Sequence, residues 1–145
     1  MTTAIRETTT NSRRLGRSVA AIVVGFIAVV ILSLGTDEVF HLLKVYPPWG
    51  QSMSNALFAL ATAYRLVYGV VGSYITARMA PYRPMQHALI GGAIGTVIAT
   101  AGAIATWNHT ELGPNWYPLA LVVTALPCAW LGGKLYESKR LQSNA

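Results

Sequence analysis

Arg65 is the residue whose position in this sequence most strongly indicates chemistry. It is the one charged residue in an apolar stretch that runs from about residue 54 to residue 77. If that stretch is a membrane-spanning helix, the guanidinium lies ~16 Å from the helix end, close to the bilayer midplane. An arginine at that depth is unfavourable by about 2.5–3.5 kcal/mol, and pairing or a ligand usually offsets this. Arg65 therefore predicts either a partner or a binding site.

The expected partners of Arg65 lie near the outer end of the preceding apolar segment. Asp37 and His41 are spaced i, i+4 and share a helix face, with Glu38 beside them. Tyr68 follows Arg65 by one helical turn. If the two faces meet, they form an outward-facing polar site that suits a small anion or a lipid headgroup. An ion pair that only sets the register of two helices remains the structural alternative.

A metal or haem bound by His41 and His109 is a further alternative, because both are expected on the outer side. Two histidines without a fixed ligand spacing do not define such a site, so no cofactor is assigned. The single cysteine, Cys128, excludes an intrachain disulfide framework and a cysteine-based metal cluster. The sequence contains no HExxH, GxSxG or Walker motif, so no enzymatic activity is predicted.

The composition explains where such a site would be held. The chain has 145 residues, of which 53% are hydrophobic and only 11% charged, whereas soluble domains carry about 25% charged residues. The net charge of +6 could indicate a nucleic-acid partner. The basic residues flank apolar segments, however, and form no stripe with interleaved aromatic residues, so we expect no nucleic acid.

We therefore predict an all-α membrane protein, a bundle of four transmembrane helices in a domain of residues 18–137. Each long uncharged stretch approaches the length of about 20 residues that a bilayer requires. A disordered basic arm is predicted over residues 1–17 and a polar tail over residues 138–145. The four spans are predicted at about residues 18–44, 54–79, 86–107 and 115–136.

The distribution of positive charge predicts the orientation. Four Lys or Arg residues precede the first span, two lie near the junction of the second and third spans, and three lie at or after the end of the fourth. Of the two other connections, the first carries only Lys44 and the second carries none. Positively charged flanks stay in the cytoplasm, so we expect both termini there. With four short spans, a lone membrane arginine and the outer loops YPPW and GPNWYP, the chain resembles small bacterial membrane proteins. We expect it in the inner membrane.

A cleaved signal peptide is the alternative for the first span. Arg13, Arg14 and Arg17 precede an apolar run, and Ser33 and Gly35 have the spacing of a cleavage site. The twin arginines also fit a twin-arginine export signal. The run is long for a signal sequence, so an uncleaved helix is the working interpretation.

A stripe of small residues on the third span predicts close helix packing, within the chain or between copies. Its members recur every four residues: Gly91, Gly95, Ala99 and Ala103. The expected partners are membrane lipid and a homo-oligomer or a larger membrane complex.

Three functions are compatible with these features. The first is binding or transport of a small anionic or lipid-like ligand at Arg65, Asp37, Glu38, His41 and Tyr68. The second is an accessory or assembly subunit that packs against a larger membrane complex. The third is a haem- or metal-binding redox protein or a membrane enzyme that uses His41 and His109.

Overall fold

The computed structural model describes residues 2–109 and 112–143, with side chains from Arg14 onward. These residues form helices and connections without any β-strand, which confirms the predicted all-α class. The four helices are α1 (Thr2–Leu42), α2 (Asn55–Met79), α3 (Pro84–Thr106) and α4 (Trp116–Ser143). Each contains a stretch that is long and apolar enough to cross a membrane, and in α1 this stretch is Arg14–Leu42.

The helix bounds differ from the predicted ones mainly at the two ends of the chain. The backbone of α1 is helical from Thr2, through the segment predicted as a disordered arm. That segment contains no proline, so nothing in it stops a helix that the apolar part of α1 has already nucleated. For the same reason α4 continues past residue 136 into the predicted tail and ends at Ser143.

The first helix ends two residues before the predicted position 44, in a left-handed turn. Lys44 has a φ of 58°, and its N–H donates to the carbonyl of His41 at 3.1 Å. The N–H of Val45 donates to the carbonyl of Phe40 at 2.9 Å, the pattern of a Schellman motif. The chain therefore turns back over the end of α1 and buries Tyr46 there.

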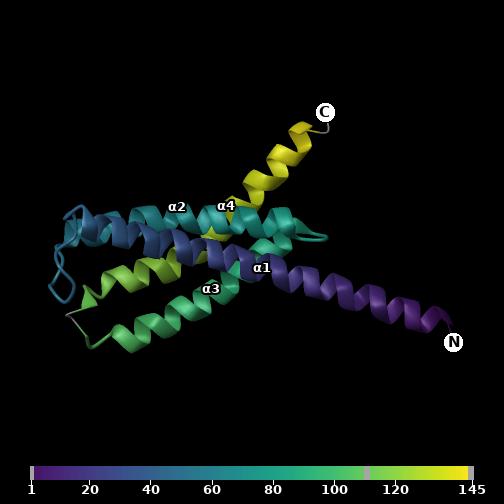
Figure 1. The fold of residues 1–145 in the computed structure, drawn as a ribbon, viewed down its shortest axis with the longest axis horizontal. Coiled ribbons are helices and arrows are strands. Elements are labelled where there is room, and N and C mark those ends of the chain that lie inside the picture. Colours follow the sequence, from purple (N-terminus) through teal and green to yellow (C-terminus); the bar gives the residue numbers. More distant parts are fainter. Residues whose placement is uncertain (1, 110–111, 144–145) are drawn as a thin grey trace.

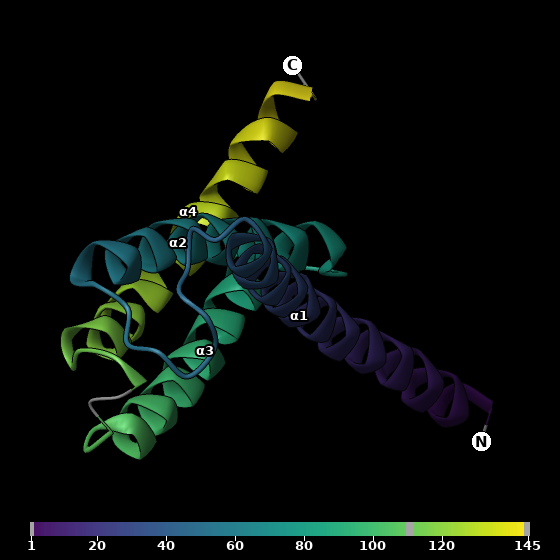
Figure 2. The same cartoon turned by 60° about the vertical axis from the view of Figure 1, so that its left-hand side comes forward.

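The four helices alternate in direction, so that both termini lie at one end of the molecule (Figure 1). The α1–α2 and α3–α4 connections lie together at the opposite end. α2 contacts all three other helices, α3 packs along α4, and α1 touches α3 only sparsely. Figure 2 shows α1 and α3 diverging from each other.

Glycines allow the closest helix contacts. A Cβ placed on Gly72 of α2 would lie 2.8 Å from the carbonyl oxygen of Gly25 on α1. A Cβ placed on Gly132 of α4 would lie 2.7 Å from the Cβ of Ser73 and 2.8 Å from the backbone nitrogen of Tyr74. These distances are too short for a real side chain, so α2 approaches both neighbours only where glycine is present.

Within this chain, the small-residue stripe on α3 faces α1 at ordinary packing distances. A Cβ on Gly95 would lie 3.6 Å from Phe26, and a Cβ on Gly91 would lie 3.9 Å from Ile22, both ordinary contact distances. The neighbouring Gly92 instead makes the close approach, to Ala129 of α4. Gly91, Gly95 and Ala99 of the stripe also line a cavity between the helices.

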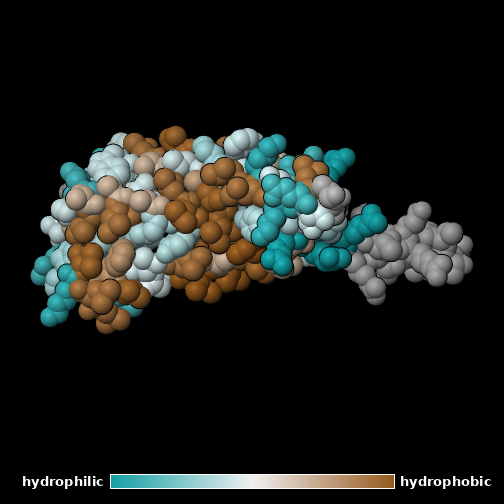
Figure 3. All heavy atoms as spheres, turned by 90° about the horizontal axis from the view of Figure 1, so that it is seen from above, coloured by the Kyte–Doolittle hydropathy of each residue, from teal (hydrophilic) through white to brown (hydrophobic). Residues whose placement is uncertain are grey.

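Large apolar side chains cover the outside of the bundle. Val97 and Val123, for example, are about 70% exposed. Figure 3 shows a hydrophobic belt across one face, with hydrophilic residues at both ends. A water-soluble domain rarely exposes contiguous apolar surface of this extent, whereas a helix bundle in lipid requires it.

Candidate functional site

Arg65 and Asp37 form an ion pair between α2 and α1. The Nη2 atom of Arg65 lies 2.5 Å from Oδ2 of Asp37, and the two side chains are 22% and 15% exposed. It is the one ion pair within the part of the chain that the structure describes. The structure therefore brings together the basic residue and one of the two acidic residues that the sequence assigned to it.

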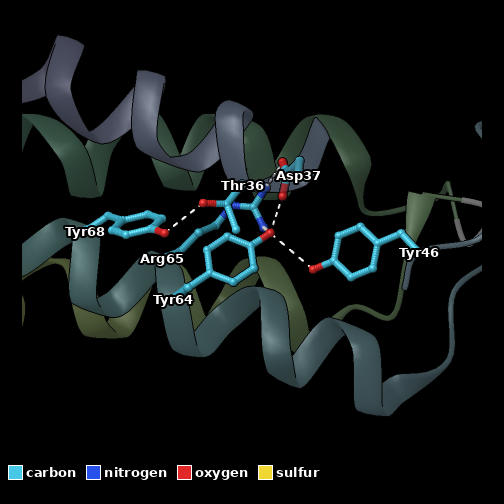
Figure 4. Close-up of polar contacts among 6 residues, drawn as sticks. All are labelled: Thr36, Asp37, Tyr46, Tyr64, Arg65 and Tyr68. Atoms are coloured by element: carbon cyan, nitrogen blue, oxygen red, sulfur yellow. Dashed lines mark hydrogen bonds and ion pairs between the residues drawn. The ribbon is translucent and has the colours of Figure 1, made fainter. Parts of the chain in front are cut away.

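Tyrosine hydroxyls complete the hydrogen bonding of this pair (Figure 4). Tyr64 donates its hydroxyl to Oδ1 of Asp37 and accepts a hydrogen bond of 3.1 Å from Nη1 of Arg65. The Tyr46 hydroxyl lies 3.1 Å from the Tyr64 hydroxyl. A chain of hydroxyl groups thus leads from the carboxylate of Asp37 to the α1–α2 connection.

Two aromatic rings flank the guanidinium of Arg65. Its Cζ atom lies 5.2 Å from the ring centroid of Tyr64 and 5.8 Å from that of Tyr117, in the first turn of α4. Cations are attracted to aromatic faces at such distances. Arg65 is therefore held by contacts with α1 and α4 as well as by its neighbour on α2.

Tyr68 lies on the same face of α2 as Arg65, but its hydroxyl forms a hydrogen bond with α1 and not with the ion pair. Its hydroxyl is 2.7 Å from Oγ1 of Thr36, and its ring centroid is 5.6 Å from that of Tyr64. Tyr68 therefore connects α2 to α1 beside the ion pair, and it supports Tyr64 without contacting the charges.

Glu38 does not join the site. It is exposed, and it makes no ion pair or hydrogen bond with the residues that the structure describes. Successive helical residues point about 100° apart, so α1 cannot turn both carboxylates toward Arg65. Asp37 alone holds the guanidinium.

His41 lies one helical turn after Asp37 on α1 and packs against the α1–α2 connection. Its ring stacks on Trp49 at a centroid distance of 3.9 Å and meets the edge of Tyr46 at 5.4 Å. Its Nδ1 atom is buried without a hydrogen-bond partner among the described residues. His109, the other candidate metal ligand, lies exposed in the α3–α4 connection. Among the described residues, no group of three or more His, Cys, Asp or Glu side chains could hold a metal.

A cavity of about 270 Å³, here called the vestibule, lies beside the ion pair at the end of the bundle that carries these two connections. Its lining combines charged, aromatic and amide groups. These include Asp37, His41, Tyr46, Trp49, Arg65 and Tyr117.

A second cavity of about 490 Å³, here called the central cavity, lies between the four helices. Its lining is almost entirely apolar and includes Val29, Leu66, Gly95, Ala99, Leu121 and Ala125. Two of its threonines satisfy their hydroxyls on their own helices, Thr76 on the Gly72 carbonyl and Thr124 on the Ala120 carbonyl. Arg65 lines both this cavity and the vestibule. Arg65 thus lies between the polar vestibule and the apolar central cavity.

Several residues of the site were not among the predicted ones. Tyr64, Tyr46 and Tyr117 contact the ion pair or its partners. The adjacency of Tyr64 to Arg65 offered no guidance, because neighbouring helical residues point in different directions. The available signal was that Tyr46 and Tyr117 both lie beside connections predicted to face outward.

Comparisons of the chain with known protein families, with curated proteins and with solved structures found no significant match.

Proposed function

We propose that this chain is an integral membrane protein that binds an acidic group, a carboxylate or a phosphate, at Arg65. The observation that carries the proposal is the position of Arg65 between the vestibule and the central cavity. An arginine that served only to join α1 and α2 would need its carboxylate partner and close packing around it. Here open space borders it on two sides.

The hydrogen bonds of Arg65 support the same proposal. A guanidinium carries five N–H groups, of which one on Nη2 is accepted by Asp37 and one on Nη1 by Tyr64, and the Tyr117 hydroxyl is also in hydrogen-bonding contact with the guanidinium. Donors therefore remain for a ligand oxygen. Charge-assisted hydrogen bonds of this kind are the strong ones in proteins, and the planar guanidinium suits carboxylate and phosphate groups.

Replacement of Arg65 tests the proposal. We expect Arg65→Met to weaken butyrate binding by about ten- to a hundredfold, the effect of one lost charge-assisted hydrogen bond. Arg65→Lys should restore binding only partly, because an ammonium cannot hold both carboxylate oxygens in one plane. Butyrate binding is measured by isothermal titration calorimetry, with the change in total tryptophan fluorescence, to which Trp49 of the vestibule contributes, as a second signal. Native mass spectrometry of the same preparations shows any retained lipid.

Two further variants make the result interpretable. The double variant Asp37→Asn with Arg65→Met removes both charges, so it tests for lost binding without leaving an unpaired carboxylate. Arg78→Met is the matched control, because Arg78 is exposed on the same helix and lines neither cavity. Wild-type butyrate binding by the Arg65→Met protein would reject the proposed site and favour the accessory-subunit function.

We also propose that the protein lies in the inner membrane with both termini in the cytoplasm. The even number of candidate spans and the shared end of the two termini support this topology, as does the basic charge around them. Reporter fusions after Lys44 and after Gly113 should then report a position outside the cytoplasm. Fusions after Arg83 and at the C-terminus should report the cytoplasm, and an external C-terminus would contradict the topology.

A further inference from the structure

We infer that the central cavity holds the hydrocarbon chain of the ligand, so that the ligand is a single-chain amphiphile with an acidic head. This inference rests on the proposed binding of the acidic group at Arg65 and extends it to the apolar side of that residue. The head would contact the free N–H groups of Arg65, and the chain would run along α2 toward Thr76.

The lining of the central cavity matches a hydrocarbon chain. The volume of about 490 Å³ falls within the range of about 300–1,000 Å³ that is usual for small-molecule sites. The hydroxyls of Thr76 and Thr124 are already bonded to carbonyls of their own helices, so they offer little to a polar ligand. Arg65 is the only charged residue that lines this cavity among the described residues.

The dimensions favour one chain over two. The cavity extends along α2 from Arg65 to Thr76, a stretch that rises ~16 Å. A volume of about 490 Å³ spread over that length leaves a narrow channel. We therefore infer one hydrocarbon chain within the cavity, and the second acyl chain of a phospholipid would have to lie outside it.

The arrangement of the helices gives the ligand's hydrocarbon chain a lateral entrance from the bilayer to the central cavity. The cavity is lined on one side by Phe26 and Val29 of α1 and on another by Gly95 and Ile98 of α3. α1 and α3 touch each other only sparsely. At Gly95 the two helices meet through the Phe26 side chain, whose ring lies 3.6 Å from the position of a Cβ. The hydrocarbon chain can therefore enter sideways from the lipid, while the acidic head reaches Arg65 through the vestibule.

Photolabelling of the full-length protein in phosphatidylcholine nanodiscs tests the inference. The probe is hexadecanoic acid with a diazirine at mid-chain, and the labelled residues are mapped by mass spectrometry. We expect labels on residues that line the central cavity and competition by unlabelled hexadecanoate. Hexadecanol, which lacks the acidic head, should compete about tenfold less well or worse. Butyrate and dihexadecanoyl phosphatidic acid should compete poorly, because one lacks the chain and the other has two.

Side chains that fill the central cavity should block binding of the ligand's hydrocarbon chain and leave the charge of Arg65 in place. Gly95→Leu places a side chain in the cavity from a position whose Cβ has ordinary room, and we expect it to lower labelling about tenfold or more. Gly91→Leu is a second variant of the same kind, with even more room for its Cβ. Gly102→Leu is the matched control on α3, because its Cβ meets open space and it does not line the central cavity.

The outcomes separate the two proposals. Wild-type labelling of both cavity-filling variants, together with lost butyrate binding in Arg65→Met, would overturn the chain site and leave the headgroup site standing. Unchanged butyrate binding and labelling in Arg65→Met would overturn both. Equal competition by hexadecanol and hexadecanoate would reject the acidic head. Labels confined to the outer, exposed residues such as Val97 would show that the probe binds the protein surface only.

Discussion

Replacing Asp37 by Asn should lower the free energy of unfolding by about 3 kcal/mol, because it leaves the guanidinium of Arg65 without an anion in a poorly hydrated setting. Loss of one partner from a fully buried ion pair costs about 3–5 kcal/mol. The pair of Arg65 and Asp37 is 22% and 15% exposed, which places the expected effect at the lower end. Asn is the suitable replacement, since its amide oxygen can still accept the Tyr64 hydroxyl. Unfolding induced by sodium dodecyl sulfate in mixed micelles provides the measurement.

Two controls give this prediction its specificity. Glu38→Gln should change the stability by less than about 0.5 kcal/mol, because Glu38 is exposed and unpaired among the described residues. Adding Arg65→Met to Asp37→Asn should recover most of the lost stability, since the pair is then removed as a whole. An equal loss of stability in Glu38→Gln and Asp37→Asn would mean that the pairing in the membrane differs from the one described here.

Gly132→Ala should destabilise the bundle by about 2 kcal/mol, although alanine is the better helix former. The added Cβ would meet the Val70 carbonyl oxygen, and it would lie 2.7 Å from the Cβ of Ser73 and 2.8 Å from the nitrogen of Tyr74. Backbone atoms cannot move away as a flexible side chain can, so α4 and α2 would have to separate. The same detergent unfolding measurement reports the change.

The matched substitution is Gly102→Ala on α3. A Cβ at Gly102 meets nothing within 4 Å, so the exchange should be neutral or should stabilise the protein by up to about 1 kcal/mol through helix propensity. If both alanine variants unfold at the same detergent concentration, the close contact of α4 with α2 at Gly132 is not a feature of the folded protein.

The sequence by itself determined the helical architecture. Long uncharged stretches, separated by polar and proline-containing connections, can satisfy their backbone groups in lipid only as helices. The predicted spans at 54–79 and 86–107 lie within two residues of α2 and α3. At the chain ends α1 and α4 extend beyond the predicted spans, because residues 1–17 and 138–145 contain no proline to terminate a helix.

The depth of a residue in the membrane could also be predicted from the sequence, but the side of the helix that faces a neighbouring helix could not. Counting residues at a fixed rise placed Arg65 near the acidic end of α1, and the structure joins it to Asp37. A helix that is apolar on every side has no polar face to show which residues meet a neighbour. The choice of Asp37 over Glu38 therefore depends on how α1 and α2 pack at Gly25 and Gly72.

Only the tertiary structure decided what surrounds Arg65. Tyr46 reaches Tyr64 because a left-handed turn at Lys44 folds the chain back over α1. The stripe that contains Gly95 lines a cavity because α1 and α3 diverge there. Such features depend on the tilt and separation of whole helices. Those are set by contacts between residues far apart in the chain, and a local spacing rule cannot encode them.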